Sequence, residues 1–413
     1  MRPMLRSQRS WLRRPPRVLF FAVVCEGPGR TGLGVNGSKP ARPLLQSQPT
    51  ALWLRKIMAM FLAAGPALCG EPGEYVGAQT CKLCHPAQFA RQSASGHARA
   101  LNRATEHPLA ASFLSQRGWQ RTRNYAFEFT RTPEGFIVEA FDYEKRRTLA
   151  LPIEWAFGAG NHAITFASRV TRDVYIEHSF SYYPDSRSFD LTPGHRFVQP
   201  ESLALAMGVL HKVVDPRGGM KRCFGCHSTG PVNVTSDSEI QPSELGVRCE
   251  VCHGPGGAHQ KAVLAGDLTG AKRLIRNPKR MTAGQLNQFC GTCHRFPGEN
   301  FVVNWNAVWN VRHQPPYLQQ SRCFQNSGGA LSCLTCHDPH ERLRQKDAAY
   351  YAAKCLACHS PRARPPASIC REQQPSDCVA CHMPQVRVTQ HLQFVNHWIG
   401  VYHGKDPLKP VKR

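Results

Sequence analysis

Residues 246–259 read GVRCEVCHGPGGAH, and Cys249-Glu-Val-Cys252-His253 within them is a Cys-x-x-Cys-His motif. The motif occurs seven times in the 413-residue chain. Its members are Cys81, Cys84 and His85; Cys223, Cys226 and His227; Cys249, Cys252 and His253; Cys290, Cys293 and His294; Cys333, Cys336 and His337; Cys355, Cys358 and His359; and Cys378, Cys381 and His382. Fourteen of the 18 cysteines therefore follow one repeated pattern.

The spacing of this motif has a chemical reason. Two thiols three positions apart can form thioethers with the two vinyl groups of one haem, and the next residue then ligates the iron. The main alternative is zinc, which paired Cys-x-x-Cys units also bind. Zinc does not require a histidine directly after the second cysteine, yet all seven motifs have one, although only 19 of 413 residues are histidine. We therefore expect seven covalently bound haem c groups.

Each haem iron can take a second, distal ligand from the twelve histidines outside the motifs. His340 follows its nearest motif histidine by three residues and His259 by six, so both are expected to ligate a neighbouring haem. His97 lies 12 residues after His85 and is free to reach its own or another iron. Of the three histidines that follow the last motif, His391 and His397 are the candidates, and His211 lies twelve residues before Cys223. The predicted distal ligands are His97, His211, His259, His340, His391 and His397.

Four cysteines stand outside the motifs. Cys25 and Cys69 lie in the amino-terminal region that export would remove. Cys323 and Cys370 remain as one pair, and we predict a disulfide between them because an exported chain meets an oxidising environment. Two separate buried thiols are the alternative.

The amino terminus reads as a targeting segment. Residues 52–70, LWLRKIMAMFLAAGPALCG, combine Arg55 and Lys56 with a short apolar stretch and small residues at a cleavage spacing, as a secretory signal does. Residues 1–51 are rich in Arg, Pro and Gly and are expected to be a disordered extension or the product of a start site placed too early. A twin-arginine signal and lipidation of Cys69 stay open. We expect a periplasmic or cell-surface protein.

The net charge of +24 falls to +14 when residues 1–70 are removed, which leaves 41 basic and 27 acidic side chains. Seven haems would add about 14 propionate carboxylates, which offset that excess. No nucleic-acid recognition motif accompanies the charge, so we expect no nucleic-acid partner. The expected partners are redox proteins, one donor and one acceptor. Membrane association is left open.

The motifs are spaced unevenly along the chain. One lies at 81–85, and the other six fall between 223 and 382. Such density leaves too few residues for a conventional core, so we expect a mostly α and irregular fold in which the haems themselves form the interior. Short helices are expected at 86–101, 201–213, 258–265, 282–290 and 346–356. The predicted segments are 71–112 for the first haem, 201–403 for six haems and 404–413 for a tail.

The long gap between the first two motifs has a different pattern. Tyr125-Ala-Phe-Glu-Phe-Thr and Gly135-Phe-Ile-Val-Glu-Ala-Phe flank a turn at 132–135, as in a hairpin. Further strand-like stretches are Thr148–Ile153, His162–Arg169, Val174–Tyr183 and Ser188–Leu191. We therefore predict a β-rich insert over 113–200. It serves either as a scaffold that covers haem edges or as a platform for a substrate or partner.

These motifs and their surroundings resemble the multihaem cytochrome c superfamily that includes the tetrahaem partner of hydroxylamine oxidoreductase, the cytochrome c-552/4-like proteins. The matching stretches are YVGAQTCKLCH, SGHARAL, GVRCEVCHGPGGAH, SRCFQNSGGALSCLTCHDPH and HLQFVNHWIG. The resemblance implies distal ligation by His97, His259, His340 and His397, and closely packed haems. The chain lacks both an eighth motif and a Cys-x-x-Cys-Lys variant, and this departure favours a carrier over a catalyst.

The sequence thus predicts an exported seven-haem c-type cytochrome that carries electrons between redox partners through mostly bis-histidine haems. The alternative is a multihaem oxidoreductase that acts on a small nitrogen or sulfur compound at one five-coordinate haem. A third hypothesis, assembly into an extracellular filament, also remains. Catalytic residues are not identifiable from the sequence.

Overall fold

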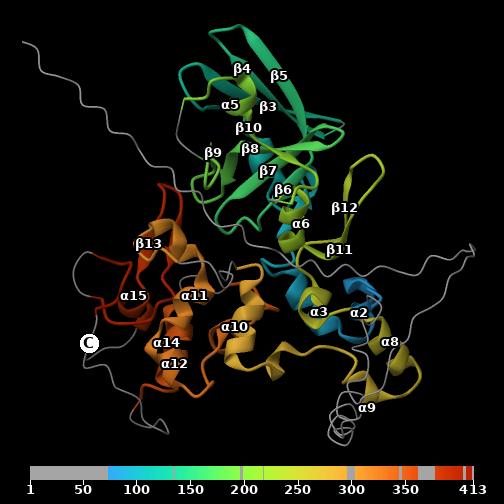
Figure 1. The fold of residues 1–413 in the computed structure, drawn as a ribbon, viewed down its shortest axis with the longest axis vertical. Helices are drawn as coiled ribbons and strands as arrows, with labels where there is room; N and C mark the ends of the chain where they lie inside the picture. The colour runs from blue at the N-terminus through green and yellow to red at the C-terminus, as the bar shows by residue number, and fades with distance from the viewer. Residues whose placement is uncertain are drawn as a thin grey trace, which may run out of the picture. The chain divides into compact units, whose positions relative to one another are not determined.

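The computed structural model describes residues 73–133, 135–195, 199–216, 218–294, 303–343, 347–360, 377–402 and 406–411 (Figure 1). The chain divides into two units, Met1–Cys69 and Gly70–Arg413, and every described residue belongs to the second. The predictions made for residues 1–70 and for Cys370 lie outside the described residues. Among the described cysteines, Cys323 forms no disulfide.

A four-stranded antiparallel sheet occupies the first part of the gap between motifs one and two. Its strands follow each other in space as they do in the chain: β2 (Gly118–Gln120), β3 (Tyr125–Thr132), β4 (Gly135–Asp142) and β5 (Arg147–Ile153). Buried and half-buried side chains alternate along β4, as expected for a strand with one face in the core. Thr132 pairs with Gly135, so the predicted turn joins β3 to β4.

A second sheet has six strands and extends beyond the predicted insert at both ends. Its strands are β1 (Leu101–Arg103), β6 (Trp155–Phe157), β7 (Ile164–Thr171), β8 (Val174–Tyr183), β9 (Ser188–Leu191) and β10 (Gly208–Lys212). They run in the order β1-β6-β7-β8-β10, and β9 also pairs with β8. The segment after the first motif therefore supplies an edge strand.

An aromatic core fills the space between strands of the two sheets. Phe113, Phe127, Phe136, Phe166 and Phe180 are all at most 1% exposed and belong to one cluster. The Phe113 and Phe166 rings lie edge to face with centroids 5.1 Å apart, an arrangement that favours aromatic pairs. Burial of each such side chain contributes about 2 kcal/mol, so this region has a conventional apolar core.

Two of the predicted helices are wrong in part. The helix expected over 201–213 ends early, because α5 covers only Leu203–Met207 and the chain then enters β10, which pairs with β8. Gly208 permits that change, since a β carbon there would lie 2.0 Å from the Glu177 carbonyl oxygen. The helix expected over 86–101 is α3, Pro86–Ser93, and a turn separates it from β1.

Short helices and two small hairpins make up most of the remaining described chain. The predicted helices at 258–265, 282–290 and 346–356 are confirmed as α8 (Gly257–Leu264), α10 (Ala283–Gly291) and α14 (Ala348–Leu356). The other helices are α2 (Ala78–Cys84), η1 (Ala104–Glu106), α4 (Ala110–Leu114), α6 (Lys221–His227), α7 (Cys249–His253), α9 (Leu268–Ala271), η2 (Pro278–Arg280), η3 (Val308–Arg312), α11 (Gln314–Gln319), α12 (Arg322–Asn326), α13 (Cys333–Cys336) and α15 (Cys378–His382).

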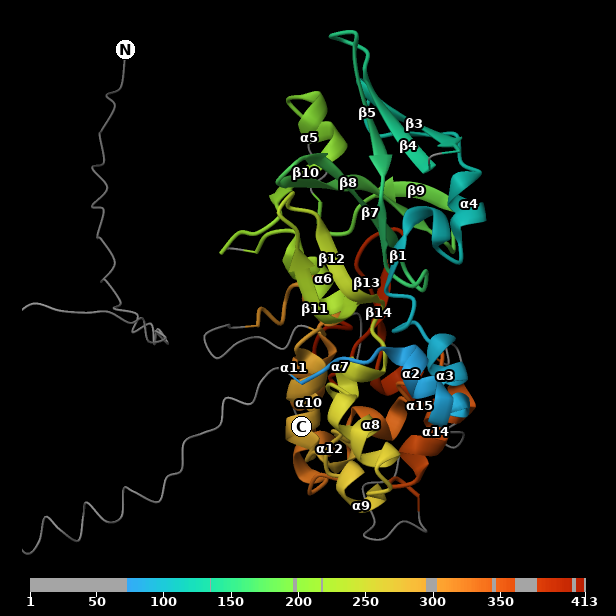
Figure 2. The same ribbon diagram turned by 90° about the vertical axis from the view of Figure 1, so that its right-hand side faces the viewer.

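The two hairpins are β11 (Ser228–Val234) with β12 (Ile240–Leu245), and β13 (Gln385–Arg387) with β14 (Gln393–Val395). Figure 2 shows the strands of the two larger sheets gathered apart from helices α8 to α12, α14 and α15. Apolar clusters among these helices are small, and one consists of Val303, Val311, Tyr317 and Val386.

Candidate haem-binding sites

All seven Cys-x-x-Cys-His motifs begin on or within a short helix. We number the sites 1 to 7 in chain order, so that site 1 contains His85 and site 7 contains His382. Helical spacing places two cysteines three positions apart on the same face. Polar caps fix where several of these helices begin: the Asp377 side chain accepts a hydrogen bond from Ala380 N at 3.0 Å, and Thr282 and Gln285 form a capping box on α10.

Four motif histidines lie opposite a histidine from outside the motifs. The ring centroids are 6.4 Å apart for His85 and His259, 6.2 Å for His253 and His340, 6.1 Å for His294 and His97, and 6.3 Å for His337 and His397. A metal–imidazole bond is about 2.0 Å long and the ring centre lies about 1.1 Å further, so two imidazoles on opposite sides of one iron have centroids about 6.2 Å apart. All four pairs match this spacing.

The second ring nitrogen of many of these histidines is held by a protein oxygen. The Nδ1 atoms of His253, His259 and His397 lie 2.8 to 2.9 Å from the carbonyl oxygens of Arg276, Ala271 and Val395. His340 Nδ1 lies 3.1 Å from the Asp338 carboxylate. Such contacts fix Nδ1 as the donor, orient the ring and leave Nε2 for a metal.

Histidines of sites 2 and 7 have the same kind of support. His227 Nδ1 lies 2.9 Å from the Ala100 carbonyl oxygen, and His382 Nδ1 lies 2.8 Å from that of Gly400. The His227 ring also meets Phe157 of β6 edge to face, with centroids 5.4 Å apart. Site 2 thus lies beside the six-stranded sheet.

Two predicted distal ligands face carboxylates rather than a motif histidine. His211 Nε2 lies 3.2 Å from Glu177 on the neighbouring strand β8. His391 Nε2 lies 2.8 Å from Asp190, and its ring stacks on Tyr183 at 4.5 Å. In both residues the nitrogen that would face a metal is therefore engaged by a carboxylate, so the arrangement of the described residues does not favour either as a ligand.

Burial keeps several of the paired histidines neutral. Removal from water disfavours the imidazolium ion and lowers the pKa of His97, His253 and His337. The same cause lowers the pKa of His294 and of His397 to about 4. A neutral imidazole retains the lone pair that ligates iron.

The number of protein ligands distinguishes a site for porphyrin iron from a site for zinc. Within the described ranges, no group of three or more His, Cys, Asp or Glu side chains is arranged to hold a metal ion by itself. Each histidine pair instead offers two imidazoles at the separation expected for axial ligands on opposite sides of one iron. Two axial ligands are what an iron requires when a porphyrin supplies the other four, so the residues fit haem.

Contacts between cysteines relate the sites to one another. The thiols of Cys81 and Cys249 hydrogen-bond, which joins sites 1 and 3. Cys252 lies close enough to Cys290 and Cys293 for their charges to interact, which brings site 3 next to site 4. Further hydrogen bonds link site 4 to site 2 through Cys293 and Cys226, and site 4 to site 5 through Cys290 and Cys333.

Two further contacts continue the series. Cys355 of site 6 lies within electrostatic range of Cys336 of site 5 and hydrogen-bonds Cys378 of site 7. In the contacts of the described cysteines, the sites follow the order 1-3-4-5-6-7, with site 2 attached to site 4.

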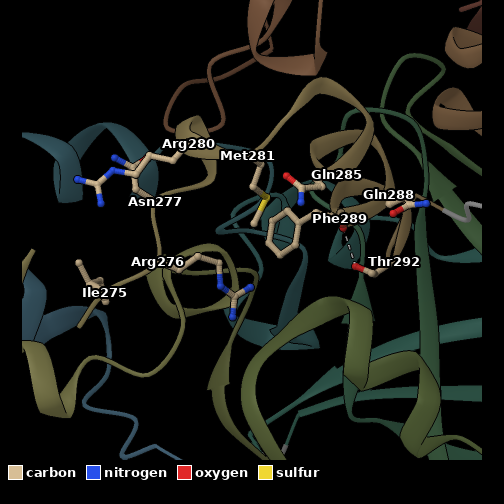
Figure 3. A pocket seen from close by; sticks show the side chains of 9 residues that line it. All are labelled: Ile275, Arg276, Asn277, Arg280, Met281, Gln285, Gln288, Phe289 and Thr292. Atoms are coloured by element: carbon tan, nitrogen blue, oxygen red, sulfur yellow. Dashed lines mark hydrogen bonds between the residues drawn. The ribbon is translucent and has the colours of Figure 1, made fainter. Parts of the chain in front are cut away.

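A pocket of about 610 Å³ lies beside sites 3 and 4 (Figure 3). Arg276 and Arg280 line it together with Met281 and Phe289, and the Arg276 guanidinium lies 5.4 Å from the centre of the Phe289 ring. The Arg276 carbonyl oxygen lies 2.8 Å from His253 Nδ1, and Arg276 N donates a hydrogen bond to the His253 carbonyl oxygen at 2.9 Å. The lining is mixed, because three apolar side chains, Ile275, Met281 and Phe289, stand beside two arginines and four neutral polar residues.

Comparison with known proteins adds one family match. Residues 204–254 match the model of the family described as cytochrome c554 and c-prime. The matched segment contains the motifs of sites 2 and 3. Together with the repeated motif, the match supports a c-type multihaem cytochrome of the electron-transfer class, with covalently bound haem c.

A solved structure with a lower level of similarity is the outer cell wall cytochrome OcwA. It is 18% identical, with a TM-score of 0.30, over 53% of this chain and 37% of that chain. This likeness defines neither the fold nor the function of the present chain. A comparison with curated protein sequences finds no match. Over the described residues, no helix has the length and apolar character needed to cross a membrane.

Proposed function

We propose that the chain is an exported seven-haem c-type cytochrome that carries electrons through mostly bis-histidine haems. The observation that carries this proposal is the spacing of the four histidine pairs, 6.1 to 6.4 Å between ring centroids. In each pair, one member is the histidine of an attachment motif and the other comes from a distant part of the chain. The proposed distal ligands are His259 for site 1, His340 for site 3, His97 for site 4 and His397 for site 5.

Histidine pairs on both faces suit electron transfer. A haem iron with two imidazole ligands changes oxidation state without losing or gaining a ligand, and its potential is tuned by hydrogen bonds and burial. The protein positions these ligands firmly. For His397, the buried Asn396 accepts a hydrogen bond from Trp398 N at 2.9 Å, and Ser321 Oγ donates to the His397 carbonyl oxygen at 3.0 Å.

The cysteine contacts support a particular order of haems. The proposed series is 1-3-4-5-6-7, with haem 2 as a side branch from haem 4. Neighbouring haems would then exchange electrons in short steps, and the branch would extend toward the β-rich region, where Phe157 meets His227. In the mature protein the sulfurs would be thioethers, so their proximity, and not their titration, supports this order.

Covalent attachment also supports export. Haem is joined to this motif outside the cytoplasm, and residues 52–70 have the composition of a secretory signal. The proposed location is the periplasm or the cell surface. The proposed partners are a protein that donates electrons and a protein that accepts them.

Intact-mass measurement and ligand binding test this function. The exported protein should carry seven haem masses, and its ferric spectrum should be low-spin. The reduced protein should not bind carbon monoxide at the four paired sites. Zinc in place of porphyrin would contradict haem binding. A high-spin fraction that binds carbon monoxide in the unmodified protein would instead favour the oxidoreductase alternative.

A further inference from the structure

Glu250 stands inside the motif of site 3 and is a buried acid, with only 3% of the residue exposed. Its Oε1 accepts hydrogen bonds from Val76 N at 3.0 Å and Gly256 N at 2.7 Å, and its Oε2 accepts one from Gly77 N at 2.8 Å. Donors from two separate stretches of the chain therefore converge on one carboxylate. Hydrogen bonds to a charged acceptor are about twice as strong as neutral ones.

The segment that contains Val76 and Gly77 and the segment that contains Gly256 lead to opposite sides of site 1. Gly77 is the N-cap of α2, which carries Cys81 and Cys84 and is followed directly by His85. Gly256 is the N-cap of α8, which carries His259. Because Glu250 holds both N-caps, it fixes the start of the helix on the proximal side of site 1 relative to the start of the helix on the distal side.

The packing around this carboxylate leaves little space for adjustment. A β carbon on Gly256 would lie 3.0 Å from Val76 Cγ2 and 3.2 Å from Glu250 Oε1. A β carbon on Gly257 would lie 2.7 Å from Glu74 Cβ, and Gly257 N donates to the Glu74 carbonyl oxygen at 2.9 Å. The glycines of the GPGG turn therefore let it lie directly against residues 74–77.

We propose that Glu250 is a positioning residue that holds the two sides of site 1 together from within the attachment motif of site 3. This inference rests on the proposed haem binding. Loss of the carboxylate should loosen the helix that presents His259. A buried negative charge also stabilises ferric over ferrous iron, so its removal should raise the reduction potential of a nearby haem.

The test compares Glu250→Gln with Glu74→Gln in the full-length exported holoprotein. The glutamine keeps the size of the side chain but removes the charge and places an amide NH₂ where backbone N–H groups need an acceptor. Glu74 joins the same two stretches through Lys261 at 2.8 Å, but its side chain is 60% exposed. Exposed ion pairs contribute little, so Glu74→Gln is the matched control.

Glu250→Gln should bind carbon monoxide at one haem, whereas the unmodified protein and Glu74→Gln bind none there. Its redox titration should show one haem whose oxidised-to-reduced equilibrium is shifted tenfold toward the reduced state, which is an upward shift of about 59 mV for a one-electron couple. A Glu250→Gln protein that matches the unmodified protein in both measurements would overturn the positioning role.

A second variant keeps the test decisive if Glu250→Gln yields no holoprotein. Glu250→Asp retains the charge, but its shorter side chain cannot reach all three donors, so partial carbon monoxide binding is expected. An Asp variant identical to the unmodified protein would refute the inference. If the unmodified protein itself carries no haem mass, the proposed function fails, whatever Glu250 does.

Discussion

At the scale of single residues, a proposed ligand differs from another half-buried histidine in which ring nitrogen a carboxylate engages. His340 presents Nδ1 to Asp338, whereas His391 presents Nε2 to Asp190. We predict that His340→Ala produces one high-spin ferric haem, visible by electron paramagnetic resonance, and that His391→Ala leaves the spectrum low-spin. A high-spin signal from His391→Ala alone would reverse the two assignments.

His178 lies in the β-rich region and is fully buried, with Nε2 2.7 Å from Ser168 Oγ. Burial lowers its pKa to about 3 from the usual 6.5. Between these values the unfolded chain binds a proton that the folded chain does not, so stability should fall as pH drops from 6.5 to 3 and be unaffected by this group below that. The total loss is at most roughly 5 kcal/mol. Denaturant unfolding of His178→Gln should lack this component, and an unchanged pH dependence would contradict it.

At the scale of elements, the capping box of α10 offers a direct test of how much local structure supports an attachment motif. Gln285 N donates to Thr282 Oγ1 at 3.3 Å, and Thr282 N donates to Gln285 Oε1 at 2.9 Å. Thr282→Ala should lower the free energy of unfolding by about 1 kcal/mol. Thr269→Ala changes an exposed threonine on α9 and should have a smaller effect in the same urea titration. Equal effects would mean that the cap does not stabilise the motif.

The helices and strands also show which features could be predicted from the sequence and which could not. Hairpin signals placed β3 and β4 correctly, because turn residues and alternation are local. The stretch 201–213 has helical character, but its second half joins β8 by pairing that no local pattern reveals. Likewise, spacing alone could not distinguish His391 from His397, because Asp190 lies 201 positions from His391 in the chain. Glu250 lies within an attachment motif, but its role could not be predicted from the sequence because its hydrogen-bond donors are up to 174 positions away.

At the scale of the whole molecule, two kinds of interior share one chain. The β-rich region buries a conventional aromatic core, and the helix of site 2 joins a second apolar cluster through Phe224. In contrast, the apolar cluster in the described chain beyond residue 300 contains only four buried side chains. Under the proposed function, haems supply the missing apolar interior, and their order then defines the path of the electrons. Site 4 occupies the junction, because its cysteines contact those of sites 2 and 5 and its neighbour is site 3.

The position of site 4 predicts how the removal of one haem changes electron transfer through the molecule. Replacement of Cys290 and Cys293 by serine should delete haem 4 and separate the remaining six haems into the groups 1-3, 2 and 5-6-7. Replacement of Cys378 and Cys381 should delete haem 7 and leave the other six connected. In fast-scan voltammetry of adsorbed protein, the haem-4 variant should therefore exchange at most about half of the charge of the haem-7 variant, although slow redox titration counts six haems in each. Equal charge from both variants at fast scan rates would show that electrons bypass site 4, and the proposed order of haems would then be wrong.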